Sequence, residues 1–171
     1  MHGTALGDEG VELLIPALAK HPKLQSLDLG DCNLGDDGIR HVCMLLPPGE
    51  NQEDFKELTL SANQNVTPAG WTQLAIGIAA SSRLRNLYLD YNNVTDFGAG
   101  VFAVAMAANS TLERIDFEGT RITDRGAELF FDVVANYPTK LKEIVVSENN
   151  ISLELIEQIN DCLAPNSENN N

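Results

Sequence analysis

The sequence has few aromatic residues and few basic residues, and each shortage argues against a class of partner. Aromatic residues make up 6% of the 171 positions, and Trp71, Phe102 and Phe130 have the spacing of a helix core rather than of an exposed stacking array. Eleven Lys and Arg residues face twenty-five Asp and Glu residues, which gives a formal charge of −14. A surface of this charge repels phosphate backbones and anionic lipid headgroups. We therefore expect neither nucleic acid nor a membrane surface as a partner.

Long apolar runs are also missing, and cysteine is scarce. No stretch reaches the roughly 18 apolar residues of a spanning helix, and the first ten residues lack the basic patch and apolar run of a signal peptide. Cys32, Cys43 and Cys162 are an odd number of cysteines, far apart and in no metal-ligand spacing. Free thiols of this kind are typical of a reducing compartment. The sequence predicts a cytoplasmic protein that needs no metal or other cofactor.

The sequence does contain a repeat. Five segments have the pattern L-x-x-L-x-L, and they begin at Leu24, Phe55, Leu84, Leu112 and Leu141. A small or amide residue and then an aliphatic residue follow each segment. With one earlier match, the aliphatic residues lie 28, 32, 28, 28 and 29 positions apart, at Leu6, Leu34, Val66, Val94, Ile122 and Ile151. A near-constant period over six matches indicates stacked structural units.

The second half of each unit has the apolar spacing of a helix. Val11, Leu14, Ile15 and Leu18 fall at i, i+3, i+4 and i+7, and the same spacing recurs in four later units. Each unit is therefore predicted to form a short strand, a turn and a helix of about ten residues. Neither half can bury its apolar side alone, so neighbouring units must stack into one core.

These motifs resemble the leucine-rich repeat family, in particular the intracellular, ribonuclease-inhibitor-like class. The resemblance implies an α/β solenoid of about five and a half repeats, with a curved parallel β-sheet on the concave side and α-helices on the convex side. We expect this domain to span residues 1–164 and a disordered polar tail to span residues 165–171. The first unit begins part-way through the motif, which we interpret as the C-terminal part of a longer array with an uncovered apolar edge. Residues 47–54 are expected to form a protruding loop.

Acidic residues recur where the helices are expected to start. Asp8, Asp36, Asp96 and Asp124 each lie two positions after the repeated aliphatic residue, close to Thr or Ser residues in the later units. Ser, Thr and Asp at a helix start can accept hydrogen bonds from the backbone N–H groups of the first turn. We therefore expect these acids to belong to the scaffold rather than to a site.

The strand face holds the candidate binding residues. The leucines of L-x-x-L-x-L point into the core, so the third, fifth, seventh and eighth places of the motif face the concave side. Eight of these twenty positions are acidic, or 40%, against 15% of the whole chain. One position is basic, and two tyrosines add aromatic surface of the kind found at protein interfaces. The predicted binding residues are Asp28, Asp31, Glu57, Tyr88, Asp90, Tyr91, Arg114, Asp116, Glu118, Glu143 and Glu148.

The leading hypothesis is a non-catalytic protein-interaction scaffold that binds a partner with a basic surface. The resemblance also allows two named alternatives, a regulator of a small GTPase like the activator of Ran and an actin-filament capping domain like that of tropomodulin. A third alternative is structural, with self-association through the N-terminal edge. An enzyme is not expected, because no nucleophile, base and orienting group occur in an activating arrangement.

Overall fold

The computed structural model describes residues 1–47 and 55–168. Its short strands form one parallel sheet in the order β1-β2-β3-β4-β5, the order of the chain. The strands are β1 (Ser26–Asp28), β2 (Glu57–Thr59), β3 (Asn86–Tyr88), β4 (Arg114–Asp116) and β5 (Glu143–Val145). Each begins at the third place of the repeat motif, and equivalent places pair with each other across the sheet.

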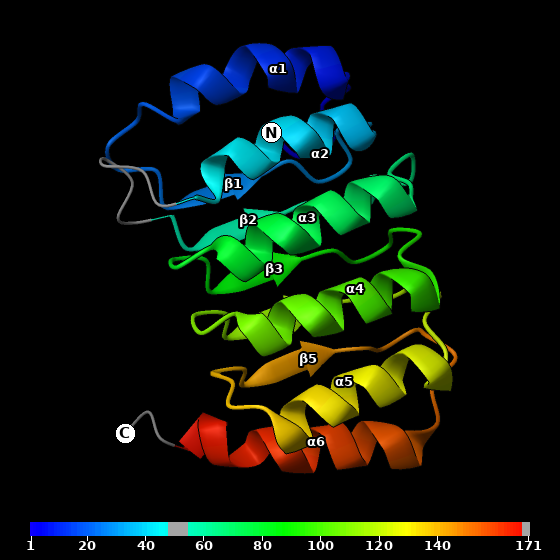
Figure 1. Ribbon diagram of the computed structural model, residues 1–171. Helices are drawn as coiled ribbons and strands as arrows, with labels where there is room; N and C mark the ends of the chain where they lie inside the picture. The colour runs from blue at the N-terminus through cyan, green and yellow to red at the C-terminus, as the bar shows by residue number, and fades with distance from the viewer. Residues whose placement is uncertain (48–54, 169–171) are drawn as a thin grey trace.

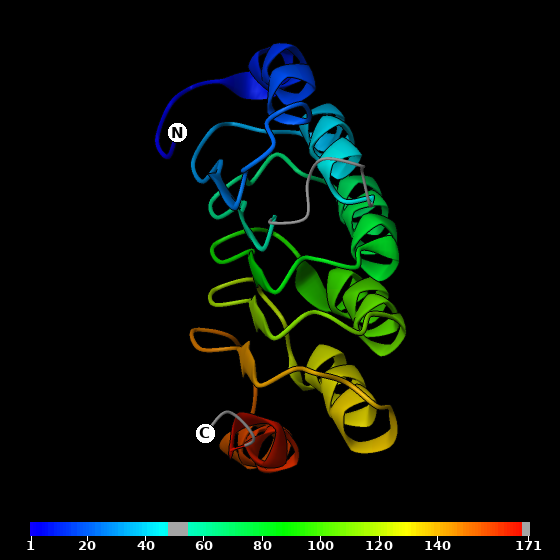
Figure 2. The same ribbon diagram turned by 90° about the vertical axis from the view of Figure 1, so that its left-hand side faces the viewer.

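Successive helices cover one face of this sheet, and the last helix of the chain lies at the end of the sheet below β5, as Figures 1 and 2 show from two directions. They are α1 (Gly7–Leu18), α2 (Asp36–Val42) with a 3₁₀ turn η1 (Cys43–Leu45), α3 (Pro68–Ala80), α4 (Thr95–Ala108), α5 (Asp124–Asn136) and α6 (Leu153–Glu168). Each helix packs against the next along the chain, and α6 also packs against β5. The predicted α/β solenoid is confirmed, and the other face of the sheet, here called the strand face, carries no helix of the described chain.

The core lies between the strands and the helices and is continuous from one repeat to the next. The leucines of the motif are buried apart from the partly exposed Leu24, and most helix residues at the predicted spacing are buried as well. Large aromatic side chains fill the middle of the core, where successive ring centroids lie 6.4, 5.5 and 5.0 Å apart along Trp71, Phe102, Phe117 and Phe130. The aromatic residues are therefore core residues, as their spacing predicted.

Buried asparagines connect neighbouring repeats behind the strands. The side-chain amide of Asn63 donates to the carbonyls of Leu29 (2.9 Å) and Leu60 (3.0 Å). Its side-chain oxygen accepts from the N–H groups of Cys32 and Leu34. Asn92 and Asn149 occupy the same place in later repeats and make equivalent bonds. An amide suits this place because it donates to and accepts from buried backbone at once. Cys32 and Thr120 hold the same place in the other two repeats, and the Thr120 hydroxyl donates to the Phe117 carbonyl.

The acids at the helix starts are scaffold residues, but they act between repeats rather than within one. Asp36 accepts from the N–H (2.8 Å) and the hydroxyl (2.6 Å) of Thr67 in the following repeat. Asp96 makes the same pair of bonds with Thr123. Asp8 and Asp124 likewise accept from the next repeat's backbone.

The expected capping of each helix by its own Thr or Ser occurs at α3, where Thr67 accepts from the N–H of Ala69 at 3.3 Å. Among the described residues, α4 and α5 have no such side-chain cap. At α5 the Thr123 hydroxyl donates to Asp96 of the preceding repeat, and α4 begins at Thr95 itself. Thr67 therefore makes both the bond to the preceding repeat and the cap, whereas Thr123 makes only the bond to the preceding repeat.

The C-terminal helix differs from the expected boundary. The sequence predicted that the helix stops near Pro165 and that residues 165–171 form a disordered tail, yet α6 continues to Glu168. Pro165 lies within the last turn of α6 and donates no backbone hydrogen bond there. Residues 169–171 lie outside the described residues. Of the predicted loop at residues 47–54, only Pro47 belongs to the described residues. Its carbonyl accepts a hydrogen bond from the Arg83 side chain at 2.7 Å.

Candidate functional site: the strand face

The register of the sheet places the predicted residues in rows across the strands. The third row contains Ser26, Glu57, Asn86, Arg114 and Glu143, and the fifth row contains Asp28, Thr59, Tyr88, Asp116 and Val145. The seventh and eighth rows follow at the ends of the strands, where backbone bonds still join neighbouring repeats. Residues far apart in the sequence are therefore neighbours on this face.

Arg114 is at the centre of one group of predicted residues. Its guanidinium group forms an ion pair with Glu143 on the next strand and lies 3.3 Å from Asp116 on its own strand. It also lies 5.6 Å from the centroid of the Tyr88 ring, which is within cation–π distance. The one basic residue of the predicted set is therefore paired with two carboxylates.

Asp116 is the most buried of the predicted acids, with 9% of its surface exposed. Burial raises the pKa of its carboxyl, although the N–H of Glu118 and the side chain of Arg114 donate to it. Burial and nearby carboxylates, with Glu57 first among them, also raise the pKa of Tyr88. The residues around Arg114 are therefore packed together and its terminal guanidinium nitrogens are paired, while its Nε is buried without a hydrogen-bond partner among the described residues.

Tyr91 is at the centre of a second, more open group. Its backbone is in the left-handed region (φ 56°) and 42% of its surface is exposed. Its hydroxyl donates to Glu118 (2.5 Å) and lies 3.4 Å from Glu148, two repeats further on. Ser147 also donates to Glu118 at 2.6 Å, and these hydrogen bonds from Ser147 and Tyr91 lower the pKa of Glu118. The hydrogen bond to Glu118 is the main cause that raises the pKa of Tyr91.

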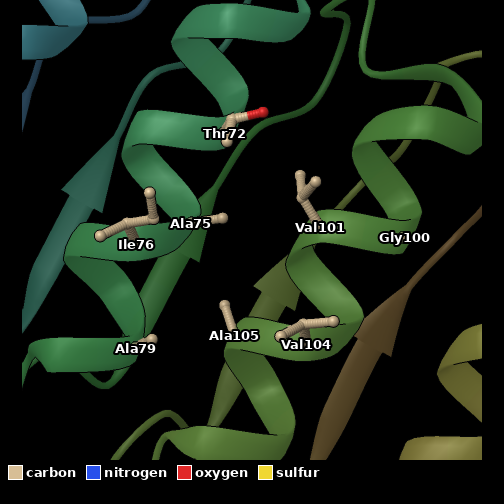
Figure 3. Close-up of a pocket in the computed structure, with 8 residues that line it drawn as sticks. All are labelled: Thr72, Ala75, Ile76, Ala79, Gly100, Val101, Val104 and Ala105. Carbon is tan, nitrogen blue, oxygen red and sulfur yellow. The ribbon is translucent and has the colours of Figure 1, made fainter.

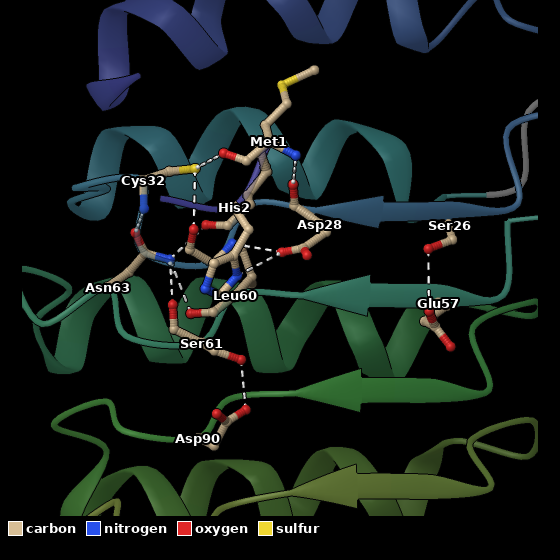
Figure 4. A network of polar contacts seen from close by, with 12 residues as sticks. Met1, His2, Ser26, Asp28, Cys32, Glu57, Leu60, Ser61, Asn63 and Asp90 are labelled. Carbon is tan, nitrogen blue, oxygen red and sulfur yellow. Dashed lines mark hydrogen bonds and ion pairs between the residues drawn. The ribbon is translucent and has the colours of Figure 1, made fainter. Parts of the chain in front are cut away.

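The remaining predicted acids lie mainly on the first strands and the turns that follow them (Figure 4). Asp28 accepts from the N–H of Gly30 at 2.9 Å and lies 3.4 Å from the ring of His2. Glu57 accepts from Ser26 at 3.1 Å. Asp90, on the third repeat, accepts from Ser61 at 2.5 Å, and Asp31 is exposed in the turn after β1.

Charge is unevenly distributed along the strands. In the five complete repeats the seventh and eighth rows hold four carboxylates and no Lys or Arg: Asp31, Asp90, Glu118 and Glu148. The second and third places hold four basic residues and three acids, namely Lys56, Arg85, Arg114, Lys142, Glu57, Glu113 and Glu143. There Glu113 pairs with Arg85 and with Lys142. The acidic surface is thus concentrated where the strands end, and we call these two rows the acidic rim.

Sequence reasoning missed several residues that shape this face. Ser26, Ser61 and Ser147 hold three of the carboxylates, and their third or seventh place in the motif would have predicted their position. His2 belongs to the preceding, incomplete repeat. The Met1 amino group donates to the carbonyl of Asp28, and the N–H of Gly3 donates to the carbonyl of Gly30. Residues at the sixth and eighth places of the later repeats make the same bonds to the next repeat. The 28-residue spacing from Leu6 to Leu34 was the available signal.

No three His, Cys, Asp or Glu side chains of the described chain are grouped so that they could hold a metal ion. Within residues 1–47 and 55–168, no helix is long and apolar enough to cross a membrane.

Comparison with known proteins identifies the repeat. Residues 20–43 and 108–131 match the family model described as leucine-rich repeat. The chain is 52% identical over 168 residues to leucine-rich repeat-containing protein 73 from Rattus norvegicus and to that from Homo sapiens. The chain is a leucine-rich repeat protein. The alignment covers 98% of this leucine-rich repeat chain and 53% of each relative, so the chain spans about half the length of these curated relatives.

Other relatives of this leucine-rich repeat protein are more distant. A protein phosphatase 1 regulatory subunit 37 homolog from Caenorhabditis briggsae is 33% identical over 91 residues, which cover 48% of this chain and 10% of that protein. Among solved structures, the tropomodulin C-terminal domain from Caenorhabditis elegans superposes with a TM-score of 0.74 and 16% identity, over 92% of this chain and 93% of that one. Actin-binding site 2 of leiomodin-1 superposes with a TM-score of 0.65 and 17% identity, over 93% of this chain and 86% of that one. These structural likenesses show the shared fold.

Proposed function

We propose that this leucine-rich repeat domain is a non-catalytic protein-interaction module that binds a basic partner through its acidic rim. The observation that carries the proposal is the set of four carboxylates in the seventh and eighth rows, which no Lys or Arg of those rows balances. Tyr91 lies among them with its ring partly exposed. Tyrosines beside charged groups are enriched in protein interfaces because they combine apolar area with a polar group.

The location of Arg114 supports a basic rather than a mixed-charge partner. Arg114 is held by Asp116, Glu143 and Tyr88 in the third and fifth rows, away from the acidic rim. A partner that approaches the strand ends therefore meets carboxylates first. Their field attracts a basic surface over a distance of about a Debye length, roughly 10 Å at 0.1 M salt, so binding should weaken as salt is added.

A charge-reversal experiment tests this proposal with a matched control. The variant Asp31→Lys/Glu148→Lys changes two exposed carboxylates of the acidic rim, and Glu128→Lys/Glu157→Lys changes two exposed carboxylates on helices α5 and α6. Both variants change the net charge equally. Proteins that the wild type captures from a lysate at about 100 mM NaCl are purified, and their binding is then measured directly. We expect the rim variant not to bind them, and we expect the wild type to release them at about 500 mM NaCl. The helix variant should retain them.

Equal binding by the wild type and the rim variant would show that the strand face is merely solvated, and the proposal would be wrong. Loss of binding by both variants would point to overall charge rather than to the acidic rim. A Tyr91→Ala variant adds a separate measure, since truncating a partly exposed aromatic anchor typically weakens an interface by about 1–2 kcal/mol.

Three named partners belong in the same assay. Actin is one, because the tropomodulin and leiomodin domains share this fold. The catalytic subunit of protein phosphatase 1 is another, because the Caenorhabditis briggsae relative is named as a homolog of its regulatory subunit. A small GTPase of the Ran type is the third, from the resemblance of the repeats. Co-sedimentation with actin filaments, binding to the phosphatase subunit and stimulated GTP hydrolysis distinguish these alternatives from one another.

A further inference from the structure

The strand face already holds one arginine, and its surroundings show how this face binds a guanidinium group. Arg114 lies 5.6 Å from the centroid of the Tyr88 ring. Its terminal nitrogens pair with the carboxylates of Asp116 and Glu143, which belong to its own strand and to the next one. A tyrosine ring and two carboxylates thus surround one guanidinium group. The aromatic face attracts a cation, and a carboxylate can accept two parallel hydrogen bonds from the planar guanidinium.

Tyr91, three residues further along the chain, forms a second group of the same composition. Its hydroxyl lies 2.5 Å from Glu118 and 3.4 Å from Glu148, which belong to the next two repeats. Among the described residues, no Lys or Arg forms an ion pair with either carboxylate. Arg121 lines a small hollow with Tyr91, but its Nη1 lies 3.4 Å from the side-chain oxygen of Asn93. Compared with the first group, this one lacks the cation.

Both carboxylates of the second group can accept further hydrogen bonds. An ionised carboxylate has about four acceptor positions. Glu118 uses two of them, for the hydroxyls of Tyr91 and Ser147. Glu148 is exposed, and the Tyr91 hydroxyl at 3.4 Å is its one side-chain donor within the described chain. Unused acceptors therefore remain beside an aromatic ring.

The Tyr91 ring is held in place before any partner arrives. It packs against the backbone of Gly119, where an added Cβ would lie 2.8 Å from a ring carbon. Its hydroxyl is fixed by Glu118, and yet 42% of the Tyr91 surface is exposed. A side chain that is already ordered loses little conformational freedom on binding, so more of the contact energy contributes to affinity.

We propose that the group of Tyr91, Glu118 and Glu148 binds an arginine side chain of the partner. The guanidinium lies against the tyrosine ring and donates to the two carboxylates, in the same combination of contacts that holds Arg114. Lysine fits less well, because its ammonium is a compact, strongly hydrated charge that does not form two parallel hydrogen bonds. This inference rests on the proposed function, since it names the basic residue that the acidic rim recognises.

The helix side of the molecule offers an arginine no comparable place in its groove. The groove between α3 and α4 is lined by apolar residues and by Thr72, and none of its lining residues is charged (Figure 3). A guanidinium there would lose hydration without gaining a charged partner. Backbone signals of Ile76 and Val104, which line this groove, therefore serve as internal references in a titration.

Nuclear magnetic resonance titration of the 171-residue chain with two peptides of equal charge tests the proposal. The peptides are tetra-arginine and tetra-lysine, both acetylated and amidated. At about 20 mM NaCl, where screening is weak, the arginine peptide should shift the amide signals of Tyr91 and Gly119. Its affinity should be about fivefold that of the lysine peptide. The signals of Ile76 and Val104 should not move.

Two pairs of variants separate the ring from general charge. Tyr91→Leu should lower the affinity ratio of the two peptides to about one, because it removes the ring and keeps the charge. Its control, Tyr137→Leu, changes a tyrosine that is 53% exposed directly after α5 and should keep the ratio. Glu148→Gln should reduce the ratio, because a bidentate partner is lost. Asp31→Asn removes a rim carboxylate outside the group and should weaken both peptides alike.

The amide spectra also show whether each variant keeps its fold, and Glu148→Gln at an exposed side chain provides a test that leaves the ring intact. Equal affinities of the wild type for the two peptides would overturn the proposal, as would a ratio that persists in Tyr91→Leu or in Glu148→Gln. These results would leave the proposed function standing, because the acidic rim requires only positive charge on its partner. That function is tested separately by the charge reversal Asp31→Lys/Glu148→Lys.

Discussion

The turn after each strand bends through a left-handed residue, and at one of these turns the residue must be glycine. The eighth place has a positive φ in every repeat, at Gly3, Asp31, Ala62, Tyr91, Gly119 and Glu148. Non-glycine residues occupy four of these six places, so the backbone conformation alone is tolerated. At Gly119 there is a second constraint, because an added Cβ would lie 2.8 Å from the ring of Tyr91. The ring of Tyr91 therefore packs directly against the backbone of Gly119, where there is no room for a side chain.

Gly119→Ala is expected to destabilise the domain and to displace Tyr91. A left-handed alanine costs about 1–2 kcal/mol, and the clash with the tyrosine ring adds to this cost, so the free energy of unfolding should fall by about 2 kcal/mol. Urea unfolding measures the loss. The matched control is Ala62→Gly, at a left-handed position (φ 56°) in an equivalent turn. It should change stability by less than about 0.5 kcal/mol, because relieved strain and added chain entropy oppose each other. Effects of equal size and opposite sign in the two variants would mean that the Tyr91 contact contributes nothing.

At the scale of the elements, the helices are joined to one another by the acids at their starts. Asp96 on α4 accepts two hydrogen bonds from Thr123, which begins the next helix. Burial opposes ionisation of Asp96, but the hydrogen bonds from Thr123 and Gly126 outweigh it and lower the pKa of the carboxyl. A charged acceptor therefore holds the N-terminus of α5 in place from the neighbouring repeat.

Asp96→Ala should lower the free energy of unfolding at pH 7 by about 1–3 kcal/mol, because it leaves the N–H of Thr123 without its acceptor. Since the folded pKa is below the unfolded value of about 3.9, the stabilisation by the ionised form is complete well above that pH and is lost as pH falls through the folded pKa. The difference between wild type and variant should therefore narrow in acid. Urea unfolding at several pH values measures both effects. The control Asp132→Ala, at an exposed acid on α5, should have little effect, and an equal loss there would contradict the assignment.

The same acids show how far sequence reasoning reached. Period and spacing were sufficient to predict the strands, the helices and the buried aromatic row, because each repeat carries its own apolar pattern. They identified Asp96 as a scaffold residue but not its partner, since a bond to the following repeat depends on how the units stack. On the strand face, alternation placed the predicted residues on one side of the sheet. It could not show that Arg114 is paired with Asp116 and Glu143, or that Tyr91 reaches Glu118, because these contacts form between strands.

At the scale of the whole molecule, the dominant feature is an excess of negative charge that is distributed unevenly. The acidic rim carries carboxylates without bases, the second and third places of the strands carry ion pairs, and α3 and α4 are almost without charge. The surface that attracts a basic partner is thus separate from the nearly uncharged helices α3 and α4. Salt should weaken the binding of such a partner, as the proposed function requires.

The net charge should also limit the stability of the fold itself. A charge of −14 in a chain of this size repels itself most in the compact state, so screening by salt should raise the melting temperature. Glu128→Lys/Glu157→Lys reduces the repulsion directly and should melt about 2–4 °C above the wild type at low salt, which corresponds to about 1 kcal/mol. The difference should vanish at about 500 mM NaCl, where the Debye length is only a few ångströms. A melting temperature that falls with salt would show instead that half-buried ion pairs, such as Glu113 with Lys142, outweigh the general repulsion.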